Sequence, residues 1–562
     1  MRACPLNART RAPAGACAQI LLGLLALLSA GTAAARAHGA AGKGLPSDAE
    51  LERHGAVIGK IIIRNENIFD LNNPKDNNAL FRLANRLHPV TRPDVIRQQL
   101  LFRTGERYSR HLLDESARIL RADPYFYDAS VTPVSYHDGK VDVLVVTRDV
   151  WTLDPGFNFS RSGGASSTGF EIEDINLFGT GTDVQLSHSH TVDRSASNVQ
   201  VSNQHTLDSW FITDLAYGSL SDGKLRQLIV NRPFYSLEAH HAGGITATDI
   251  TEDNSLYDRG QIVDKFSNQA RFFQLYGGWS PGLEHGWTRR FSAGLTDDEH
   301  HFGLPVGPWS GPTVLPADRK FVYPWLRFDL VQDQFIKLRN RNQIGRTEDF
   351  DLGAYATVQV GWANVALGSS REAVPFMLAA GDGYELDAND TLLLSGVMTG
   401  RIERGELRNG VLRGVVSFFD EQSSSNRWLF FSSVKGAAGK RLDLENQILL
   451  GGDNGLRGYP LRYQDGTSRL LFSAEERYFS DWFPLQIFRV GAAVFFDMGR
   501  TWGQAPLAAP GYGWLKDVGF GLRLGNARTG LGNVIHVDLA FPLDARGNIS
   551  QVQFLVQTEQ QF

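Results

Sequence analysis

From Trp151 to the end of the chain, apolar and polar residues alternate with a period of two. In the first such run, Trp151, Leu153 and Phe157 fall on one side, and Thr152 and Asp154 fall on the other. This alternation is typical of β-strands that have one apolar and one polar face. Turns rich in Gly, Asn and Asp separate further runs at 183–190, 225–231, 321–330, 351–361, 392–402, 428–434, 491–497, 518–524 and 552–562.

The number of these runs and their alternation of apolar and polar residues favour a transmembrane β-barrel over a soluble propeller or double sandwich. At roughly 25 residues per strand and turn, residues 151–562 would form about 16 antiparallel strands, an even number as in outer-membrane barrels. Aromatic residues gather near the expected strand ends, as at membrane interfaces. They include Trp279, Trp325, Tyr478, Phe479, Trp482 and Phe483. The chain ends on an alternating strand that closes with Phe562, although Glu559 and Gln560 make this end unusually polar.

Residues 57–150 show a different pattern, which predicts a small domain with the order β-α-α-β-β. A strand is expected around Ile61–Ile63, one helix begins near Pro93 and a second begins near Ser109. Two strands follow, at 126–135 and 141–148, joined by the tight turn Asp138-Gly139. In the last of these strands, one side carries three valines: Val141, Val143 and Val145.

The N-terminal residues predict export. Three arginines precede an apolar run from Ile20 to Leu28, and Ala35-Arg36-Ala37 supplies the small residues expected at a cleavage site, so we interpret 1–37 as a signal peptide. The run is shorter than the roughly 20 residues of a spanning helix. Residues 38–56 are interpreted as a linker. Both cysteines lie before the expected cut, so the mature chain would have no thiol and no disulfide.

Charge argues against nucleic acid as a partner. The whole chain has 56 basic and 61 acidic residues, and the predicted signal removes four arginines and no acid. The mature chain would therefore have 56 − 4 = 52 basic residues and a net charge of 52 − 61 = −9. Nucleic acid selects basic surfaces.

One segment between two predicted strands combines an arginine with several glycines. It reads Gly451-Gly452-Asp453-Asn454-Gly455-Leu456-Arg457-Gly458-Tyr459-Pro460. Its Arg457-Gly458-Tyr459 resembles the Arg-Gly-Tyr/Phe motif on the sixth extracellular loop of the BamA/TamA-like superfamily (bacterial surface antigen family). Three other segments also resemble motifs of that family: 173–181, Glu475–Arg477 and Phe495–Gly499. The β-α-α-β-β unit resembles a single POTRA domain of the same family.

The resemblance implies a tether inside the barrel. Arg457 would reach carboxylates on the inner wall, Asp497 and also Glu475, and Tyr459 would pack beside the loop tip. A guanidinium can form two parallel hydrogen bonds with one carboxylate, which explains arginine rather than lysine. The glycines would allow positive φ and close approach to the wall. The alternative is a solvated loop arginine within an ordinary turn.

The resemblance also implies a function in the outer membrane, with the small domain in the periplasm. The protein would insert or translocate unfolded or β-strand polypeptides without a chemical energy source. The strand that holds Val141, Val143 and Val145 would pair with the client, and Phe562 would belong to the C-terminal assembly signal. Membrane lipid and client polypeptides are the implied partners, with periplasmic chaperones or accessory envelope proteins as further candidates. Two alternatives remain: a pore or transporter for small solutes or lipids, and a structural envelope protein.

The sequence does not predict an enzyme or a cofactor. It contains no Gly-x-Ser-x-Gly elbow, His-Glu-x-x-His helix or phosphate-binding Walker loop. The adjacent pairs His240-His241 and His300-His301 could bind a metal only if both side chains faced one way. Neighbouring residues on a strand point to opposite faces, so no metal site is expected.

Overall fold

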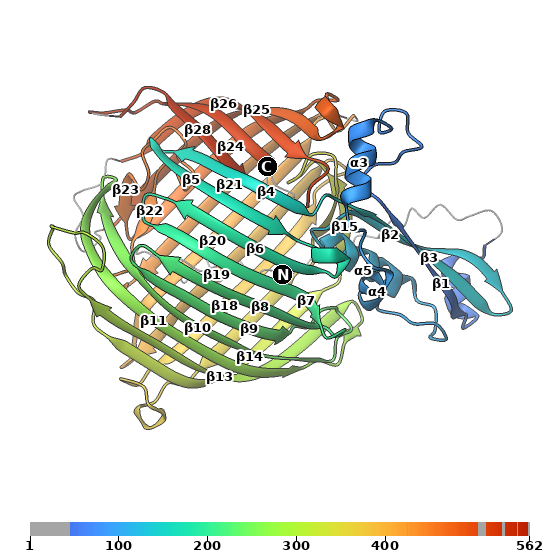
Figure 1. Cartoon of the computed structure of the whole chain (residues 1–562). Coiled ribbons are helices and arrows are strands. Elements are labelled where there is room, and N and C mark those ends of the chain that lie inside the picture. Colours follow the sequence, from blue (N-terminus) through green and yellow to red (C-terminus); the bar gives the residue numbers. More distant parts are fainter. Residues whose placement is uncertain (1–44, 424, 504–512, 531–533, 548, 560–562) are drawn as a thin grey trace.

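The computed structural model describes residues 45–423, 425–503, 513–530, 534–547 and 549–559. A small N-terminal domain sits at one end of a closed β-barrel (Figure 1). The predicted signal peptide, Phe562 and the polar Gln560 lie outside the described residues. We call the end of the barrel that carries the small domain the domain end, and the opposite end the distal end.

The N-terminal domain is a three-stranded sheet covered by helices. In chain order it contains α2 (Asp48–Arg53), β1 (Val57–Glu66), α3 (Ala79–Leu87), α4 (Pro93–Gln98), α5 (Arg110–Ala122), β2 (Phe126–His137) and β3 (Lys140–Asp149). The side chain of Ser109 caps α5, which explains why that helix begins where the sequence predicts. Leu113, Ala117 and Leu120 of α5 pack on the sheet and form the core with the valines of β3.

Two sequence interpretations of this region are wrong. Three helices, not two, lie between β1 and β2, because the predicted order overlooked α3. The predicted linker 38–56 also contains α2, whose Leu51 is fully buried in the domain core. The domain therefore begins by residue 48, and its β-α-α-α-β-β order with a preceding helix differs from the expected POTRA pattern.

The barrel is closed and antiparallel, but the prediction of about 16 strands is wrong. In the described residues, twenty strands form the ring, and the two-residue β12 extends one hairpin. The strands are β4 (Leu153–Ser162), β5 (Ala165–Asp174), β6 (Thr182–His190), β7 (Ser195–Thr206), β8 (Phe211–Leu220), β9 (Gly223–Arg232), β10 (His241–Asp258), β11 (Gln261–Trp279), β12 (Leu283–Glu284), β13 (Trp287–Gly303), β14 (Arg319–Gln332), β17 (Tyr355–Gly361), β18 (Val374–Glu385), β19 (Asp390–Glu403), β20 (Glu406–Glu421), β21 (Trp428–Lys440), β24 (Ser468–Phe479), β25 (Phe488–Trp502), β26 (Leu515–Asn526), β27 (Val534–Pro542) and β28 (Gln553–Glu559).

Short turns explain the larger number of strands. Only Gly163 and Gly164 separate β4 from β5, and only Arg404 and Gly405 separate β19 from β20. All four of these residues have positive φ, which suits two-residue hairpin turns. A repeat of roughly 25 residues therefore overestimates the length of strand and turn together, and four strands were missed.

The outer wall of the barrel is apolar in a continuous band. Exposed side chains such as Leu215, Leu275, Phe291, Leu326 and Phe520 alternate with residues that face the interior. This is the pattern of a barrel surrounded by lipid. Among the described residues, no helix has the length and apolar character needed to cross a membrane.

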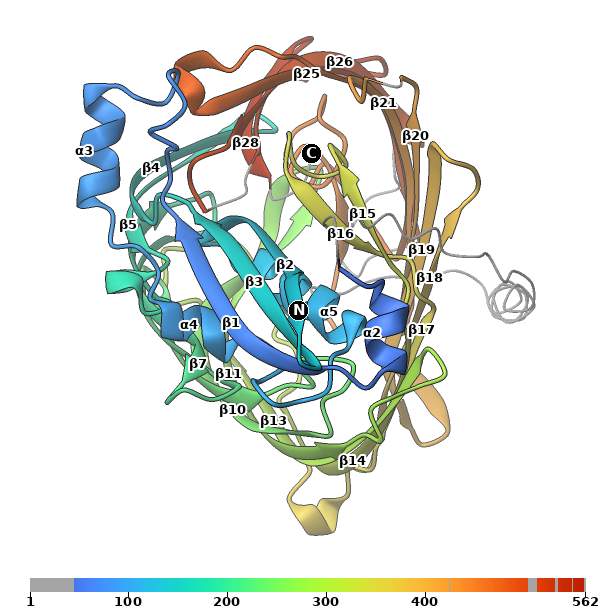
Figure 2. The ribbon, with the colours of Figure 1, turned by 90° about the vertical axis from the view of Figure 1, so that its right-hand side faces the viewer.

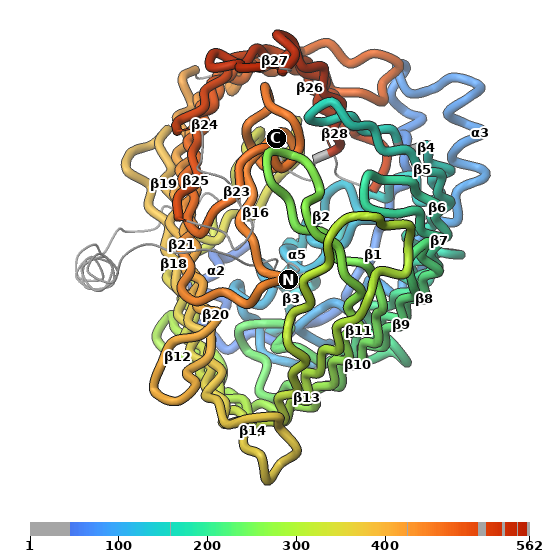
Figure 3. Tube along the Cα trace, turned by 90° about the vertical axis from the view of Figure 1, so that its left-hand side faces the viewer, coloured from blue at the N-terminus to red at the C-terminus, as the bar shows by residue number. Residues whose placement is uncertain are grey.

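Two segments enter the barrel from opposite ends. At the distal end, residues 441–467 connect β21 to β24 and include the short strands β22 (Ile448–Leu450) and β23 (Gln464–Gly466); we call them the luminal loop. Figure 3 shows this segment in orange inside the ring. At the domain end, residues 333–354 connect β14 to β17 and contain β15 (Phe335–Arg339) and β16 (Thr347–Asp351); we call them the domain-end hairpin. Figure 2 shows it beside α5, within the ring.

Candidate functional site: the luminal loop and its anchors

Arg457 lies at the tip of the luminal loop and contacts both carboxylates that the sequence resemblance suggested. Its Nε and Nη2 donate to the two carboxylate oxygens of Asp497, at 2.7 and 3.0 Å, and its Nη1 donates to Oε1 of Glu475 at 2.6 Å. The guanidinium also stacks 3.5 Å above the ring of Phe495. Burial alone would lower the pKa of Arg457, but the facing carboxylates of Asp497 and Glu475 raise it well above its usual value.

Strand register explains why these side chains meet. Glu475 on β24 lies opposite Phe495 on β25, so Glu475, Phe495 and Asp497 all face the interior. The side chains of Asp497 and Glu475 are almost completely buried, and that of Arg457 is 12% exposed. Each charge is therefore largely removed from water and depends on its partners for compensation.

Further charged residues surround this contact on β24 to β27, and the sequence analysis did not include them in the site. Arg477 donates through Nε to Oε2 of Glu475 at 2.9 Å. Arg523 pairs with Asp538, whose second oxygen lies 3.9 Å from Arg457. Arg477 could have been found, because it lies two residues after Glu475 and must share its face. Arg523 and Asp538 have no comparable signal in the sequence.

Gly458 and Tyr459 seat the loop tip against the barrel wall. A Cβ on Gly458 would lie 2.6 Å from the Cβ of Asp517, so only glycine fits this close approach. Tyr459 is fully buried, and its hydroxyl donates to the carbonyl of Lys516 at 2.9 Å. Of the four loop glycines for which positive φ was expected, only Gly455 has it; the others serve close approach.

The same loop touches both sides of the junction between the first and last barrel strands. Ser162, at the end of β4, donates through Oγ to the carbonyl of Gly452 at 2.6 Å. On the other side, the Tyr459 hydroxyl accepts a hydrogen bond from the backbone N–H of Asp544, just after β27. The loop thus bridges the β4–β28 seam.

The seam itself has very little strand pairing. In the described residues, β28 and β4 share one Cα pair, Val556 with Arg161. By contrast, β27 and β28 share seven pairs and β4 and β5 share ten. On β28 the side chain of Phe554 is exposed, whereas those of Gln553 and Leu555 on the opposite face are buried. Among the described residues, the junction of β28 with β4 therefore has the fewest paired residues of the ring.

Three more ion pairs hold the luminal loop across the distal opening. Arg401 on β19 forms two hydrogen bonds with Asp443, at 2.7 and 2.8 Å, and Arg319 on β14 pairs with Glu445 at 2.7 Å. Arg462 forms two hydrogen bonds with Asp193, between β6 and β7, at 2.6 and 2.7 Å. The loop is therefore fixed to three parts of the wall. Among the strands of the described residues it is the eighth of ten distal connections, not the sixth as the resemblance implied.

The domain-end hairpin links the N-terminal domain to the same charged cluster. Arg121 on α5 donates to both oxygens of Asp349, each at 2.7 Å, and Arg346 donates to the carbonyl of Phe126 at 2.6 Å. Deeper in the barrel, Arg477 donates to the carbonyl of Arg341 at 3.1 Å. Ile344 packs in an apolar cluster with Phe419, Leu429 and Phe479 of the wall. One set of contacts thus runs from the N-terminal domain to Arg457.

The strand predicted to pair with clients, β3, lies at the centre of its sheet and not at an edge. The sheet order is β1-β3-β2, so β3 is the central strand, hydrogen-bonded on both sides. Val141, Val143 and Val145 are completely buried in the domain core. A central strand has no free edge, so β3 cannot accept another strand. The available edges belong to β1 and β2.

The side chains of His300 and His301 have different neighbours. No group of three or more His, Cys, Asp or Glu among the described residues is placed to hold a metal ion. His300 lies near Asp298, whereas His301 pairs with Glu299 and Asp318. The two side chains therefore engage different partners.

The fold of the chain is similar to those of solved structures of BamA and CdiB. BamA from Haemophilus ducreyi lacking POTRA domains 1–3 matches with a TM-score of 0.40 and 14% identity, over 89% of this chain and 85% of that one. CdiB from Acinetobacter baumannii matches with a TM-score of 0.44 and 13% identity, over 90% and 73%. The copper transporter OprC matches with a TM-score of 0.38 and 10% identity, over 78% and 86%. No protein-family model and no curated protein sequence matches the chain.

Proposed function

We propose that this protein inserts or translocates polypeptides at the outer membrane, driven by folding of the client rather than by a chemical energy source. The N-terminal domain would lie in the periplasm and the distal end outside the cell. The observation that carries the proposal is the seam between β4 and β28, with its single pair of Val556 and Arg161. Parted strands offer unpaired backbone groups, and an extended client can add to such an edge.

The luminal loop would control this seam. It contacts Ser162 on one side and the segment after β27 on the other, while Arg457 fixes its tip to the wall. Release of Arg457 would free both contacts. The loop and the domain-end hairpin also occupy the lumen from opposite ends, so a client that passed through the lumen would have to displace both.

Initial capture of a client would use the edge of β2 instead of β3. The first part of this edge is occupied, because Arg346 bonds the carbonyl of Phe126 and Arg121 bonds that of Ala129 at 2.7 Å. Residues 130–137 extend beyond these contacts. We expect a photo-crosslinking amino acid at Thr132 to capture unfolded polypeptide, and one at Lys60 on β1 to capture much less.

A disulfide across the seam tests the proposal directly. Cys4 and Cys17 are the only cysteines and precede the predicted signal cleavage site, so added cysteines would stand alone in the mature chain. Arg161→Cys with Val556→Cys should, when oxidised, stop a reconstituted protein from inserting a urea-denatured barrel client into liposomes, and reduction should restore activity. The control pair Leu539→Cys with Phe554→Cys lies across β27 and β28, which stay paired.

The same variants separate this function from that of a solute pore. A pore should conduct ions in planar bilayers whether or not the seam is locked, and it should give no polypeptide adduct at Thr132. Undiminished client insertion by the oxidised Arg161–Val556 variant would contradict seam opening. Absence of any polypeptide adduct, together with selective conductance, would favour the pore.

A further inference from the structure

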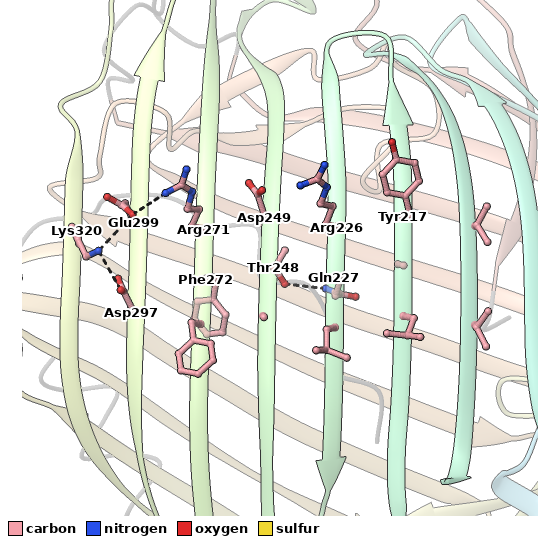
Figure 4. A pocket seen from close by; sticks show the side chains of 17 residues that line it. Tyr217, Arg226, Gln227, Thr248, Asp249, Arg271, Phe272, Asp297, Glu299 and Lys320 are labelled. Atoms are coloured by element: carbon pink, nitrogen blue, oxygen red, sulfur yellow. Dashed lines mark hydrogen bonds and ion pairs between the residues drawn. The ribbon is translucent and has the colours of Figure 1, made fainter. Parts of the chain in front are cut away.

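The outer wall of the barrel carries a groove that none of the interactions described above uses. It has a volume of about 740 Å³ and lies over β7 to β14 (Figure 4). Two rows of cross-strand neighbours form it. The row nearer the distal end contains Tyr217, Arg226, Asp249, Arg271, Glu299 and Lys320, each paired in register with the next. We call it the charged row.

The second row lies one step nearer the domain end and is mostly apolar. It contains Leu215, Leu228, Ala247, Phe273 and Asp297, again in register. Leu228 and Phe273 are 40% and 42% exposed, and the small Ala247 stands between them. A short side chain between two large ones leaves a depression in the wall. Further apolar residues lie nearer the domain end, among them Ile245 and Leu275.

The charged row therefore marks the border between the apolar band and the polar distal part of the wall. This is the level at which lipid headgroups meet a transmembrane barrel. The row holds three cations and, counting Asp297 beside it, three carboxylates, so the cluster is neutral overall. Lys320 lies 3.2 Å from Asp297 and 3.6 Å from Glu299, and Arg271 lies 3.9 Å from Glu299.

Two of the charged side chains in this row have no ion pair among the described residues. Arg226 and Asp249 are register partners on β9 and β10, and neither has an oppositely charged group within 4.0 Å. They present one positive and one negative charge side by side above the depression at Ala247. An anionic headgroup would meet Asp249 unfavourably, whereas a headgroup with a phosphate and an ammonium could use both residues.

We propose that this groove binds one zwitterionic aminophospholipid. Arg226 binds the phosphate, Asp249 accepts hydrogen bonds from the primary ammonium, and an acyl chain lies over Ala247 between Leu228 and Phe273. The amine must carry N–H groups, so phosphatidylethanolamine fits and the trimethylated phosphatidylcholine does not. This inference rests on the barrel being embedded in lipid and is independent of whether the seam opens.

Native mass spectrometry of the delipidated full-length protein tests the assignment, with phosphatidylethanolamine, phosphatidylcholine, phosphatidylglycerol and lipid A offered in competition. We expect one retained phosphatidylethanolamine. Ala247→Leu fills the depression without altering any charge and should lower its occupancy at least tenfold. Asp249→Asn should abolish the preference for phosphatidylethanolamine over phosphatidylcholine. Arg226→Ala should weaken both.

Arg289→Ala is the matched control, because Arg289 lies on the same wall near the domain end and pairs with Glu284 at 3.6 Å in an exposed position. It should leave lipid binding unchanged. Each variant is first shown to be folded by its heat-dependent gel shift. Wild-type occupancy in Ala247→Leu, preferential retention of phosphatidylglycerol or lipid A, or an equal loss in Arg289→Ala would each overturn the proposal.

Discussion

Arg457 and Arg477 share one carboxylate, that of Glu475. Arg457 donates to Oε1 at 2.6 Å, and Arg477 donates to Oε2 at 2.9 Å. Arg457 belongs to the luminal loop, whereas Arg477 also holds the carbonyl of Arg341 in the domain-end hairpin. A movement at either end of the barrel therefore changes the surroundings of the same buried carboxylate.

Removal of Arg457 should release the luminal loop while the barrel stays folded. Arg457→Ala leaves Asp497 and part of Glu475 buried without compensation, and breaking a buried pair from one side typically costs about 3 to 5 kcal/mol. Proteolysis within residues 441–467 should become much faster, and client insertion should fall. Arg457→Lys should give an intermediate result, because an ammonium cannot form the two parallel bonds to Asp497.

The protease resistance of the luminal loop, compared with that of a control variant, decides whether Arg457 is a tether. Arg408→Ala is a suitable control, since its pair with Glu406 is exposed and such pairs contribute about 0 to 1 kcal/mol. If the loop of Arg457→Ala remained as resistant to protease as that of Arg408→Ala, Arg457 would not be a tether.

Gly458→Ala should have nearly the same effect without removing any charge. The added methyl group would lie 2.6 Å from the Cβ of Asp517 and 3.0 Å from the backbone nitrogen of Pro542. The tip would have to withdraw, which lengthens the contacts of Arg457. We expect faster proteolysis of the loop and lower client insertion. Gly277→Ala, where a Cβ would meet no atom within 4 Å, should be neutral, and equal behaviour of the two variants would show that close approach at Gly458 is unimportant.

Local patterns in the sequence were enough to suggest the partners of Arg457. Alternation places Glu475 and Asp497 on one face of their strands, and the resemblance of the loop motif pointed to the interior. The same alternation could not count the strands, because the two-residue turns at Gly163 and Arg404 shorten the repeat. It also merged the domain-end hairpin with the barrel, since residues 351–361 form a single run of alternating residues although β16 ends at Asp351 and β17 begins at Tyr355.

Position within a sheet depends on contacts that are distant in the chain. Val141, Val143 and Val145 correctly indicate a strand with one buried face, but a central and an edge strand can share that pattern. The parallel pairing of β1 with β3 places β3 in the middle, and it joins two strands that α3, α4, α5 and β2 separate in the chain. Similarly, the contact between Arg121 and Asp349 joins residues that are 228 positions apart.

The contact between Arg121 and Asp349 should hold the domain-end hairpin on the N-terminal domain. Both side chains are largely buried, and the guanidinium bonds both carboxylate oxygens. Arg121→Ala and Asp349→Ala should each increase hydrogen exchange in β15 and β16 by more than tenfold, corresponding to over about 1.4 kcal/mol. The double variant should exchange little faster than either single variant, because each change already removes the shared contact. Additive effects would show that the two residues act independently.

The N-terminal domain should become less stable as pH rises from about 4 to about 7. Asp123, at the end of α5, accepts a hydrogen bond from the hydroxyl of Tyr125 at 2.6 Å, and loss of hydration raises its pKa to about 7. In an unfolded chain the pKa of aspartate is about 3.9. Between these values the folded domain binds more protons than the unfolded chain, so its stability falls with increasing pH until Asp123 is fully ionised.

Hydrogen exchange of α5 in the full-length protein, corrected for intrinsic rates, should therefore be faster at pH 8 than at pH 5.5. Asp123→Asn keeps an acceptor for Tyr125 without the charge, so it should remove most of this dependence and slow exchange at pH 8. Asp94→Asn, which changes an exposed carboxylate on α4, should preserve the wild-type dependence. An unchanged pH profile in Asp123→Asn would show that another group controls it.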